Sequence, residues 1–195
     1  MDHDKPLTVL AIAGSARQGA YSVRLRDAAR RAVEQAGAEA SVLDLRALGL
    51  PLYDGDLEAG EGVPAGAATL RDAIVAHDAL LLVTPEYNWF PTPLELNAFD
   101  WLSRLKDGLA ATADKPVALL SSSPGPFGGM RALALMRQFL GGVFRMAVQP
   151  TVLSVPRAAE AFADEGTLSD PKAAAALQAA VQALLREAAR RRAVP

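Results

Sequence analysis

The chain has 195 residues, of which 51% are hydrophobic, and its formal net charge is −2 at pH 7. This length is typical of one sizeable α/β domain, and the weak negative charge gives no electrostatic basis for binding nucleic acid or an anionic membrane. Because the sequence contains no cysteine, disulfide scaffolds, thiolate zinc sites and cysteine nucleophiles are excluded. With only two histidines in the chain, we predict neither a metal site nor a catalytic triad.

The beginning of the chain and the lengths of its apolar stretches bear on localisation. Residues 1–6 lack the features of a signal peptide, and no apolar stretch approaches the roughly 18 residues that span a bilayer. We therefore expect a cytoplasmic protein without nucleic-acid or membrane partners. We also expect one domain over residues 1–195, in which residues 1–6 form a disordered tail.

Short apolar runs alternate with helical patterns along the chain. The runs show little polar alternation, as is typical of buried parallel strands. They cover residues 7–13, 40–45, 79–84, 116–121 and 148–155. Helical periodicity and capping signals predict helices over 23–36, 67–76, 93–105, 129–144 and from 171 onward.

Five strands alternating with five helices predict an α/β fold, a doubly wound parallel sheet between two helical layers. Right-handed crossovers favour the flavodoxin-like strand order 2-1-3-4-5. Ligands of such sheets bind beyond the carboxyl ends of the strands, near the switch point between strands 1 and 3. The loops after strands 1, 3 and 4 should therefore meet. The acidic stretch 51–66 is either an exposed connection, or a loop that overhangs this site or contacts a second subunit.

The loop between the first predicted strand and helix has the composition of a phosphate-binding loop. Gly14 and Gly19 allow the backbone to approach a ligand closely, while Ser15, Arg17 and Ser22 add hydrogen-bond donors beside a helix N-terminus. The loop lacks the Gly-Lys-Ser/Thr ending of a P-loop and the G-x-G-x-x-G of dinucleotide folds. A terminal monophosphate, as in FMN, suits it better.

Several further segments carry a family resemblance. Thr-Pro-Glu-Tyr-Asn occupies residues 84–88, Asn-Ala-Phe-Asp-Trp-Leu-Ser residues 97–103, and Leu-Pro-Leu-Tyr-Asp residues 50–54. With the glycine–serine loop, and the serines of 121–123 followed by two glycines, they resemble the NADPH-dependent FMN reductase family. Within it, the bacterial quinone and chromate reductases are the most similar subgroup. Five matches in the same order over residues 9–150 are more specific than any one of them.

The resemblance implies an FMN-dependent oxidoreductase that passes electrons from NADPH or NADH to quinones or similar acceptors. The residues it assigns to cofactor binding are Ser15, Arg17, Ser22, Pro85, Glu86, Tyr87, Asn88, Ser121, Ser122 and Ser123. The first three would hold the phosphate and the others would surround the flavin ring. Because flavin reduction needs no protein nucleophile, we expect no catalytic side chain. The resemblance also implies a homodimer or homotetramer with the flavin near a subunit interface.

One segment departs from the family pattern. Family members usually have glycine and a small residue after Tyr-Asn, and a lysine before the helix asparagine. This chain has Trp89 and Phe90 after Tyr-Asn, lacks the lysine and adds Glu95. The two aromatic side chains either turn outward, to line an acceptor or subunit surface, or crowd the flavin ring. The alternative function is therefore a non-enzymatic flavodoxin-like binding module whose flavin site is altered by these two residues.

Overall fold

The computed structural model describes residues 5–15, 17–163 and 166–193. Its strands are β1 (Thr8–Ala13), β2 (Glu39–Leu43), β3 (Ala79–Thr84), β4 (Pro116–Ser122), β5 (Ala147–Val148) and β6 (Leu153–Val155). They form one parallel sheet in the order β2-β1-β3-β4-β5, and β6 also pairs with β4. The predicted fold class and strand order are confirmed.

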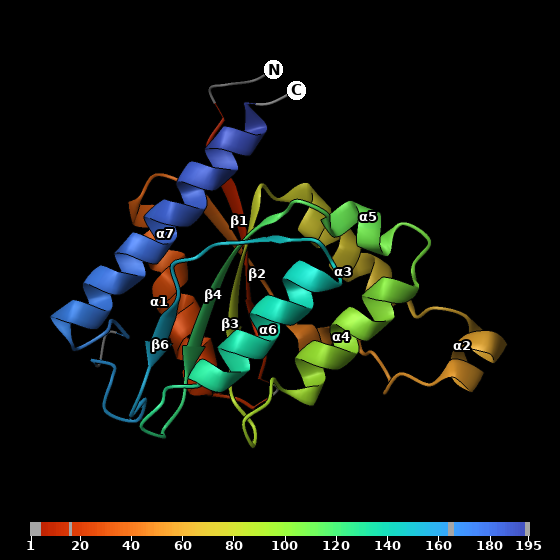
Figure 1. Ribbon diagram of the computed structural model, residues 1–195, viewed down its shortest axis with the longest axis horizontal. Helices are drawn as coiled ribbons and strands as arrows, with labels where there is room; N and C mark the ends of the chain where they lie inside the picture. The colour runs from red at the N-terminus through yellow and green to blue at the C-terminus, as the bar shows by residue number, and fades with distance from the viewer. Residues whose placement is uncertain (1–4, 16, 164–165, 194–195) are drawn as a thin grey trace.

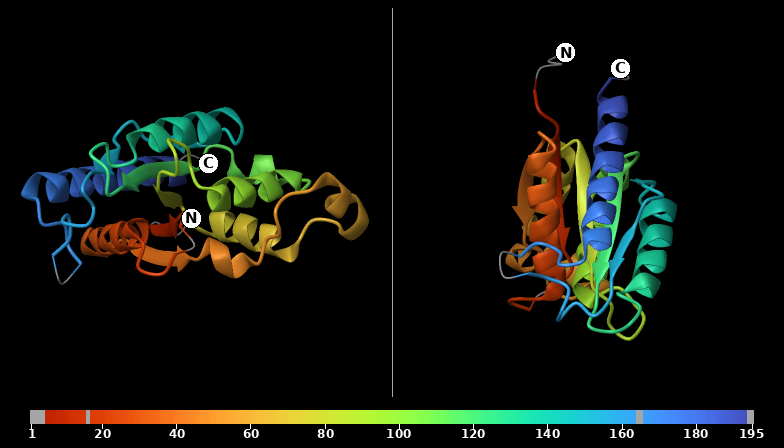
Figure 2. Two further views of the ribbon diagram at one scale, coloured as in Figure 1. Left: turned by 90° about the horizontal axis from the view of Figure 1, so that it is seen from below. Right: turned by 90° about the vertical axis from the view of Figure 1, so that its left-hand side faces the viewer.

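Helices cover both faces of the sheet (Figures 1 and 2). They are α1 (Tyr21–Gln35), α2 (Gly55–Glu61), α3 (Ala65–Ala76), α4 (Pro93–Arg104), α5 (Gly108–Thr112), α6 (Met130–Gly142) and α7 (Pro171–Arg192), with a 3₁₀ helix at Leu45–Leu48. α1 and α7 pack on one face through residues such as Leu25 and Leu184. α3, α4 and α6 pack on the other through residues such as Ile74, Phe99 and Met136. In the described parts of the chain, no helix is both long and apolar enough to cross a membrane.

The structure corrects three details of the prediction. The apolar run 148–155 is not one strand, because β5 and β6 are separated by residues 149–152 and pair with different parts of β4. Pro150 lies in this break and has no N–H to contribute to a ladder. β2 was expected to be buried, but it is an edge strand with largely exposed side chains. The acidic stretch 51–66 contains α2, whose N-terminus is capped by the Asp54 carboxylate.

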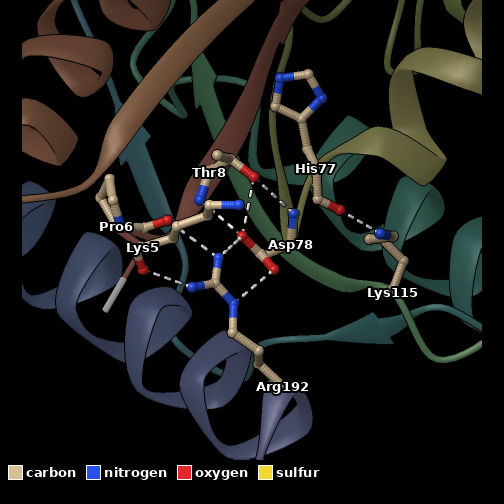
Figure 3. Close-up of polar contacts among 7 residues, drawn as sticks. All are labelled: Lys5, Pro6, Thr8, His77, Asp78, Lys115 and Arg192. Carbon is tan, nitrogen blue, oxygen red and sulfur yellow. Dashed lines mark hydrogen bonds and ion pairs between the residues drawn. The ribbon is translucent and has the colours of Figure 1, made fainter. Parts of the chain in front are cut away.

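A cluster of polar residues connects the amino end of the sheet to the C-terminal end of α7 (Figure 3). Arg192 bonds to the Asp78 carboxylate and to the carbonyl oxygens of Lys5, at 2.7 Å, and Pro6, at 3.0 Å. Asp78 also accepts the Thr8 N–H at 2.7 Å and the Thr8 hydroxyl at 2.8 Å. Lys5 and Pro6 belong to the segment predicted as a disordered tail, and both have bound carbonyl groups here. Residues 1–4 of that segment lie outside the described residues.

Candidate functional site

Three loops with unusual sequences meet at the carboxyl edge of the sheet. The neighbouring strand ends are in register, with Ala13 beside Val83 and Thr84 beside Ser121. The Gly14 N–H continues the pattern by donating to the Val83 carbonyl at 3.0 Å. In Figure 1 the loops after β1, β3 and β4 lie at the lower end, away from the two chain ends. The predicted meeting of these loops is therefore observed.

The loop after β1 borders a cleft of about 330 Å³. The residues lining it are Ala13, Ser15, Arg17, Gln18, Gly19, Val23, Arg26, Asp44 and Arg46. Ser15 is buried and its hydroxyl oxygen accepts the Arg17 N–H at 3.2 Å, which fixes the turn of the loop. Arg17 is exposed and its guanidinium lies 5.8 Å from the centre of the Tyr21 ring. Ala16, which belongs to the predicted loop, lies outside the described residues.

The N-terminus of α1 lies beside this cleft. Its N-cap is Ala20, which has no side-chain oxygen, so no side-chain cap is present. Ser22, in the first turn, is buried, and its hydroxyl has no partner among the described residues. Free N–H groups at a helix N-terminus attract anions, and a buried unpaired hydroxyl is costly until it finds a partner. These features fit a terminal monophosphate such as that of FMN.

The loop after β3 is a tight hairpin. Tyr87 and Phe90 exchange two backbone hydrogen bonds, at 2.9 and 3.0 Å. Between them, Asn88 and Trp89 have φ angles of 50° and 74°. Two successive positive φ angles are typical of a type I′ turn, which favours Asn-Gly, so the tryptophan strains the second position. Trp89 and Phe90 are 63% and 59% exposed. Both side chains therefore reach the surface at the rim of the candidate site, where either of the two predicted arrangements remains open to them.

Arg131 links this hairpin to the loop after β4. Its guanidinium lies 4.1 Å from the centre of the Trp89 ring and 4.3 Å from the centre of the Phe127 ring. Each such cation–π contact contributes about 0.5–1 kcal/mol at an exposed site. The two loops at the rim of the site are therefore joined by one stack of three side chains.

Glu86 caps the N-terminus of α6. One of its carboxylate oxygens accepts the backbone N–H groups of Arg131, at 3.0 Å, and Ala132, at 3.1 Å. The N-cap residue itself, Gly129, has no side chain with which to do this. The preceding Pro85 is buried, whereas Tyr87 and Asn88 are exposed at the loop surface. The carboxylate at this position is thus a helix cap rather than a solvated surface group.

The three serines after β4 differ in their surroundings. The Ser121 hydroxyl is buried and donates to the Gly128 carbonyl at 2.7 Å, and the Ser123 hydroxyl accepts the Gly125 N–H at 3.2 Å. Both shape the loop that leads into α6. The Ser122 hydroxyl is buried and unpartnered among the described residues.

Glu95, in the first turn of α4, is a site residue that our sequence reasoning missed. Its carboxyl group is fully buried, and burial raises the pKa of Glu95 to about 8. One carboxyl oxygen lies 2.6 Å from the Thr84 hydroxyl and accepts the Thr92 N–H at 3.4 Å, while the other has no partner among the described residues. Thr92 and Glu95 form a capping box, and this Thr-x-x-Glu pattern, visible in the sequence, usually indicates an exposed helix start.

Another cleft lies at the opposite edge of the sheet. It has a volume of about 620 Å³, and His77, Lys115 and the C-terminal part of α7 line it. Its arginines are already paired, as in the Arg191–Asp114 contact at 3.3 Å. None of the predicted site residues lies there.

Comparison with known proteins agrees with the geometry of the carboxyl edge. The sequence model of the family described as NADPH-dependent FMN reductase matches residues 7–160. The NAD(P)H-dependent FMN reductase of Pseudomonas aeruginosa is 36% identical over 179 residues, covering 91% of this chain and 93% of the relative. A quinone reductase of Escherichia coli is 35% identical over 177 residues, covering 83% of this chain and 88% of the relative.

A solved structure adds evidence at the level of the fold. The flavoenzyme NAD(P)H:(acceptor) oxidoreductase FerB from Paracoccus denitrificans has a TM-score of 0.76 and 30% sequence identity. The match covers 93% of this chain and 97% of that protein. Because the family model spans most of the sequence and these relatives align along most of their own length, the chain belongs to the NADPH-dependent FMN reductase family.

Proposed function

We propose that this protein is an FMN-dependent oxidoreductase that passes electrons from NADPH or NADH to quinones or similar acceptors. The observation that carries the proposal is the phosphate loop, whose residues Ser15, Arg17 and Gly19 line a cleft at the carboxyl edge. Among the described residues, the start of α1 next to this loop has no side-chain cap and the Ser22 hydroxyl has no partner. Membership of the FMN reductase family supports the same cofactor.

Each part of the site has a distinct role in this proposal. Ser15, Arg17 and Ser22 bind the phosphate, while residues 85–88 and 121–123 surround the ring. Bound FMN supplies the hydride chemistry between donor and acceptor. The protein holds and orients the ring and leaves one face open.

No side chain is assigned to acid–base catalysis. The Glu86 carboxylate is engaged by two N–H groups of α6, and this contact positions the hairpin against the loop after β4. We therefore assign Glu86 to holding the ring-binding loop in place.

The rim of the site also suggests how copies of the chain associate. An apolar cleft of about 430 Å³ lies between α4 and α6 and is lined by Phe90, Leu96, Leu135 and Phe139 among others. With the exposed Trp89, it supports a homodimer or homotetramer, since interface cores are rich in aromatic residues. Sedimentation velocity at micromolar concentration should show a dimer or tetramer, and a monomer would contradict this part of the proposal.

An absorption spectrum tests the central proposal. The purified protein is mixed with FMN, desalted, and reduced anaerobically with NADPH and, separately, with NADH. We expect flavin bands that survive desalting and bleach with at least one donor. Retained flavin that neither donor reduces contradicts the nicotinamide assignment. Absence of retained flavin, together with a flat FMN titration, favours the non-enzymatic binding module instead.

A further inference from the structure

A buried carboxyl group without a counter-ion lies directly beneath the phosphate loop. A Cβ atom added to Gly14 would lie 1.9 Å from the Glu95 carboxyl carbon, so a larger residue at this position would require the Glu95 side chain to move. The Thr92 hydroxyl, next to the carboxyl group, donates to the Gly14 carbonyl at 2.5 Å. Glu95 and Thr92 together therefore support the residue that precedes Ser15.

The same carboxyl group also contacts the ring-binding loop. The Thr84 hydroxyl lies 2.6 Å from a Glu95 carboxyl oxygen and 3.3 Å from the Pro85 carbonyl oxygen. A protonated Glu95 can donate to this hydroxyl, which can then donate to Pro85. Glu95 thus lies where the phosphate loop and the ring-binding loop leave the sheet.

The surroundings of Glu95 contain no charge that would stabilise a carboxylate. The groups facing it are Gly14 at the end of β1, Thr84 at the end of β3, and Thr92 on its own helix. Burial is the largest influence on its pKa and raises it, while the hydrogen bonds from Thr84 and Thr92 lower it. Among the described residues, no lysine, arginine or histidine pairs with it.

We propose that Glu95 is a positioning residue of the cofactor site, which supports Gly14 in its protonated form and must keep its proton for the phosphate of FMN to bind. This inference rests on the proposed function. A phosphate at the start of α1 carries up to two negative charges, and a buried carboxylate behind Gly14 would repel them through a medium of low dielectric constant. FMN binding and ionisation of Glu95 therefore oppose each other, so binding takes up a proton wherever free Glu95 is ionised.

The test compares the FMN dissociation constant of the native protein and Glu95→Gln between pH 6.5 and 9.5, measured by quenching of flavin fluorescence. Glutamine has nearly the same shape as the protonated acid and stays uncharged over this pH range. The native dissociation constant should be level below about pH 7.5 and rise up to about tenfold per pH unit above about pH 8, while that of Glu95→Gln stays level. Equal slopes for the two proteins would overturn the proposal.

Two controls separate this effect from other titrations. Glu61→Gln, an exposed change in α2, should keep the native slope. Riboflavin lacks the phosphate, so its binding to the native protein should depend far less on pH than that of FMN. If riboflavin and FMN show the same slope, repulsion of the phosphate is not the cause.

A direct measurement of proton uptake completes the design and needs no variant. Calorimetric titration of the native protein with FMN at pH 8.5, in two buffers of different ionisation enthalpy, should report a net uptake of protons. Zero uptake would overturn the proposal even if Glu95→Gln did not fold. If FMN binds to neither protein at any pH, the proposed function itself fails.

Discussion

At the scale of single residues, the polar groups of the phosphate loop differ in how far the fold already engages them. The Ser15 hydroxyl accepts a backbone N–H, whereas the Ser22 hydroxyl has no partner in the described structure. The Arg17 guanidinium faces the Tyr21 ring and has no ion pair among the described residues. Arg17 would therefore make the main charged contact with a bound phosphate.

Replacement of Arg17 by alanine should weaken FMN binding by about 10- to 150-fold, which corresponds to roughly 1.5–3 kcal/mol for a charge-assisted hydrogen bond. A fluorescence titration with FMN measures the effect. Arg30→Ala is the control, because Arg30 lies farther along the chain, within α1, and pairs with Glu34. Equal affinities of the two variants would remove Arg17 from the phosphate site.

Glu95 should make the unliganded protein less stable as the pH rises. The pKa of Glu95 is about 8 in the folded protein against 4.5 as its ordinary value, so the folded state binds its proton more tightly. The contribution of Glu95 to stability is therefore largest below about pH 4.5 and declines as the pH rises to about 8. Glu95→Gln should raise the free energy of unfolding by up to about 3 kcal/mol at pH 7 and by much less at pH 5. Urea unfolding at both pH values checks this, and a gain independent of pH would contradict it.

At the scale of elements, apolar runs predicted the central strands well because β1, β3 and β4 are covered on both faces. The same runs could not reveal that β2 lies at the edge, since exposure there depends on which strands pair. The break between β5 and β6 could have been predicted from Pro150, which has no N–H to contribute to a ladder. The short helix α2 was missed because its glycines and acidic residues also suit a loop.

The candidate site, like the fold, was predicted only in part from the sequence. Strand order alone brings the loops after β1, β3 and β4 together, and the sequence was sufficient for that order. The roles of Glu86 and Glu95 could not be predicted, because a carboxylate in a loop and one in a capping box both suggest exposure to solvent. The packing of Gly14 against α4 shows that Glu95 is buried. The contact of α6 with the hairpin shows that the Glu86 carboxylate is hydrogen-bonded.

The hairpin at the rim allows a paired test of backbone strain. Trp89→Gly relieves the left-handed conformation but loses the stack on Arg131, so the free energy of unfolding should change by less than about 1 kcal/mol. Trp89→Ala loses the stack without relieving the strain, and should be about 1 kcal/mol less stable than Trp89→Gly. Thermal or chemical denaturation of the pair measures the difference. Equal stability would show that the turn is not strained.

At the scale of the whole molecule, the carboxyl and amino edges of the sheet have different roles. The carboxyl edge gathers the loops of the candidate site, while the amino edge holds the cluster of Arg192, Asp78 and Thr8. Desolvation opposes the ionisation of Asp78, but hydrogen bonds from Arg192 and Thr8 outweigh it and hold the pKa of Asp78 below its usual value. The amino edge should therefore influence stability without altering the cofactor site.

Replacement of Asp78 by asparagine should lower the free energy of unfolding by about 1–2 kcal/mol at pH 7, because it removes a charged partner of Arg192. Since the folded pKa is depressed, this contribution is present above about pH 4 and is lost as Asp78 becomes protonated in acid. Asp72→Asn, which removes a more exposed partner of Arg71, is the control. FMN affinity should be unchanged in both variants, and a loss specific to Asp78→Asn would show that the two edges are coupled.

The hydrogen bonds from Arg192 to the carbonyl groups of Lys5 and Pro6 make this architecture suited to circular permutation. Both ends of the described chain lie at the amino edge, close together in Figures 1 and 2. A short linker can join them without crossing any loop of the candidate site. New ends placed after α2, between Glu61 and Gly62, would open the chain at an exposed point and leave the order of strands in the sheet intact. We therefore expect a protein permuted in this way to keep the geometry of the candidate site.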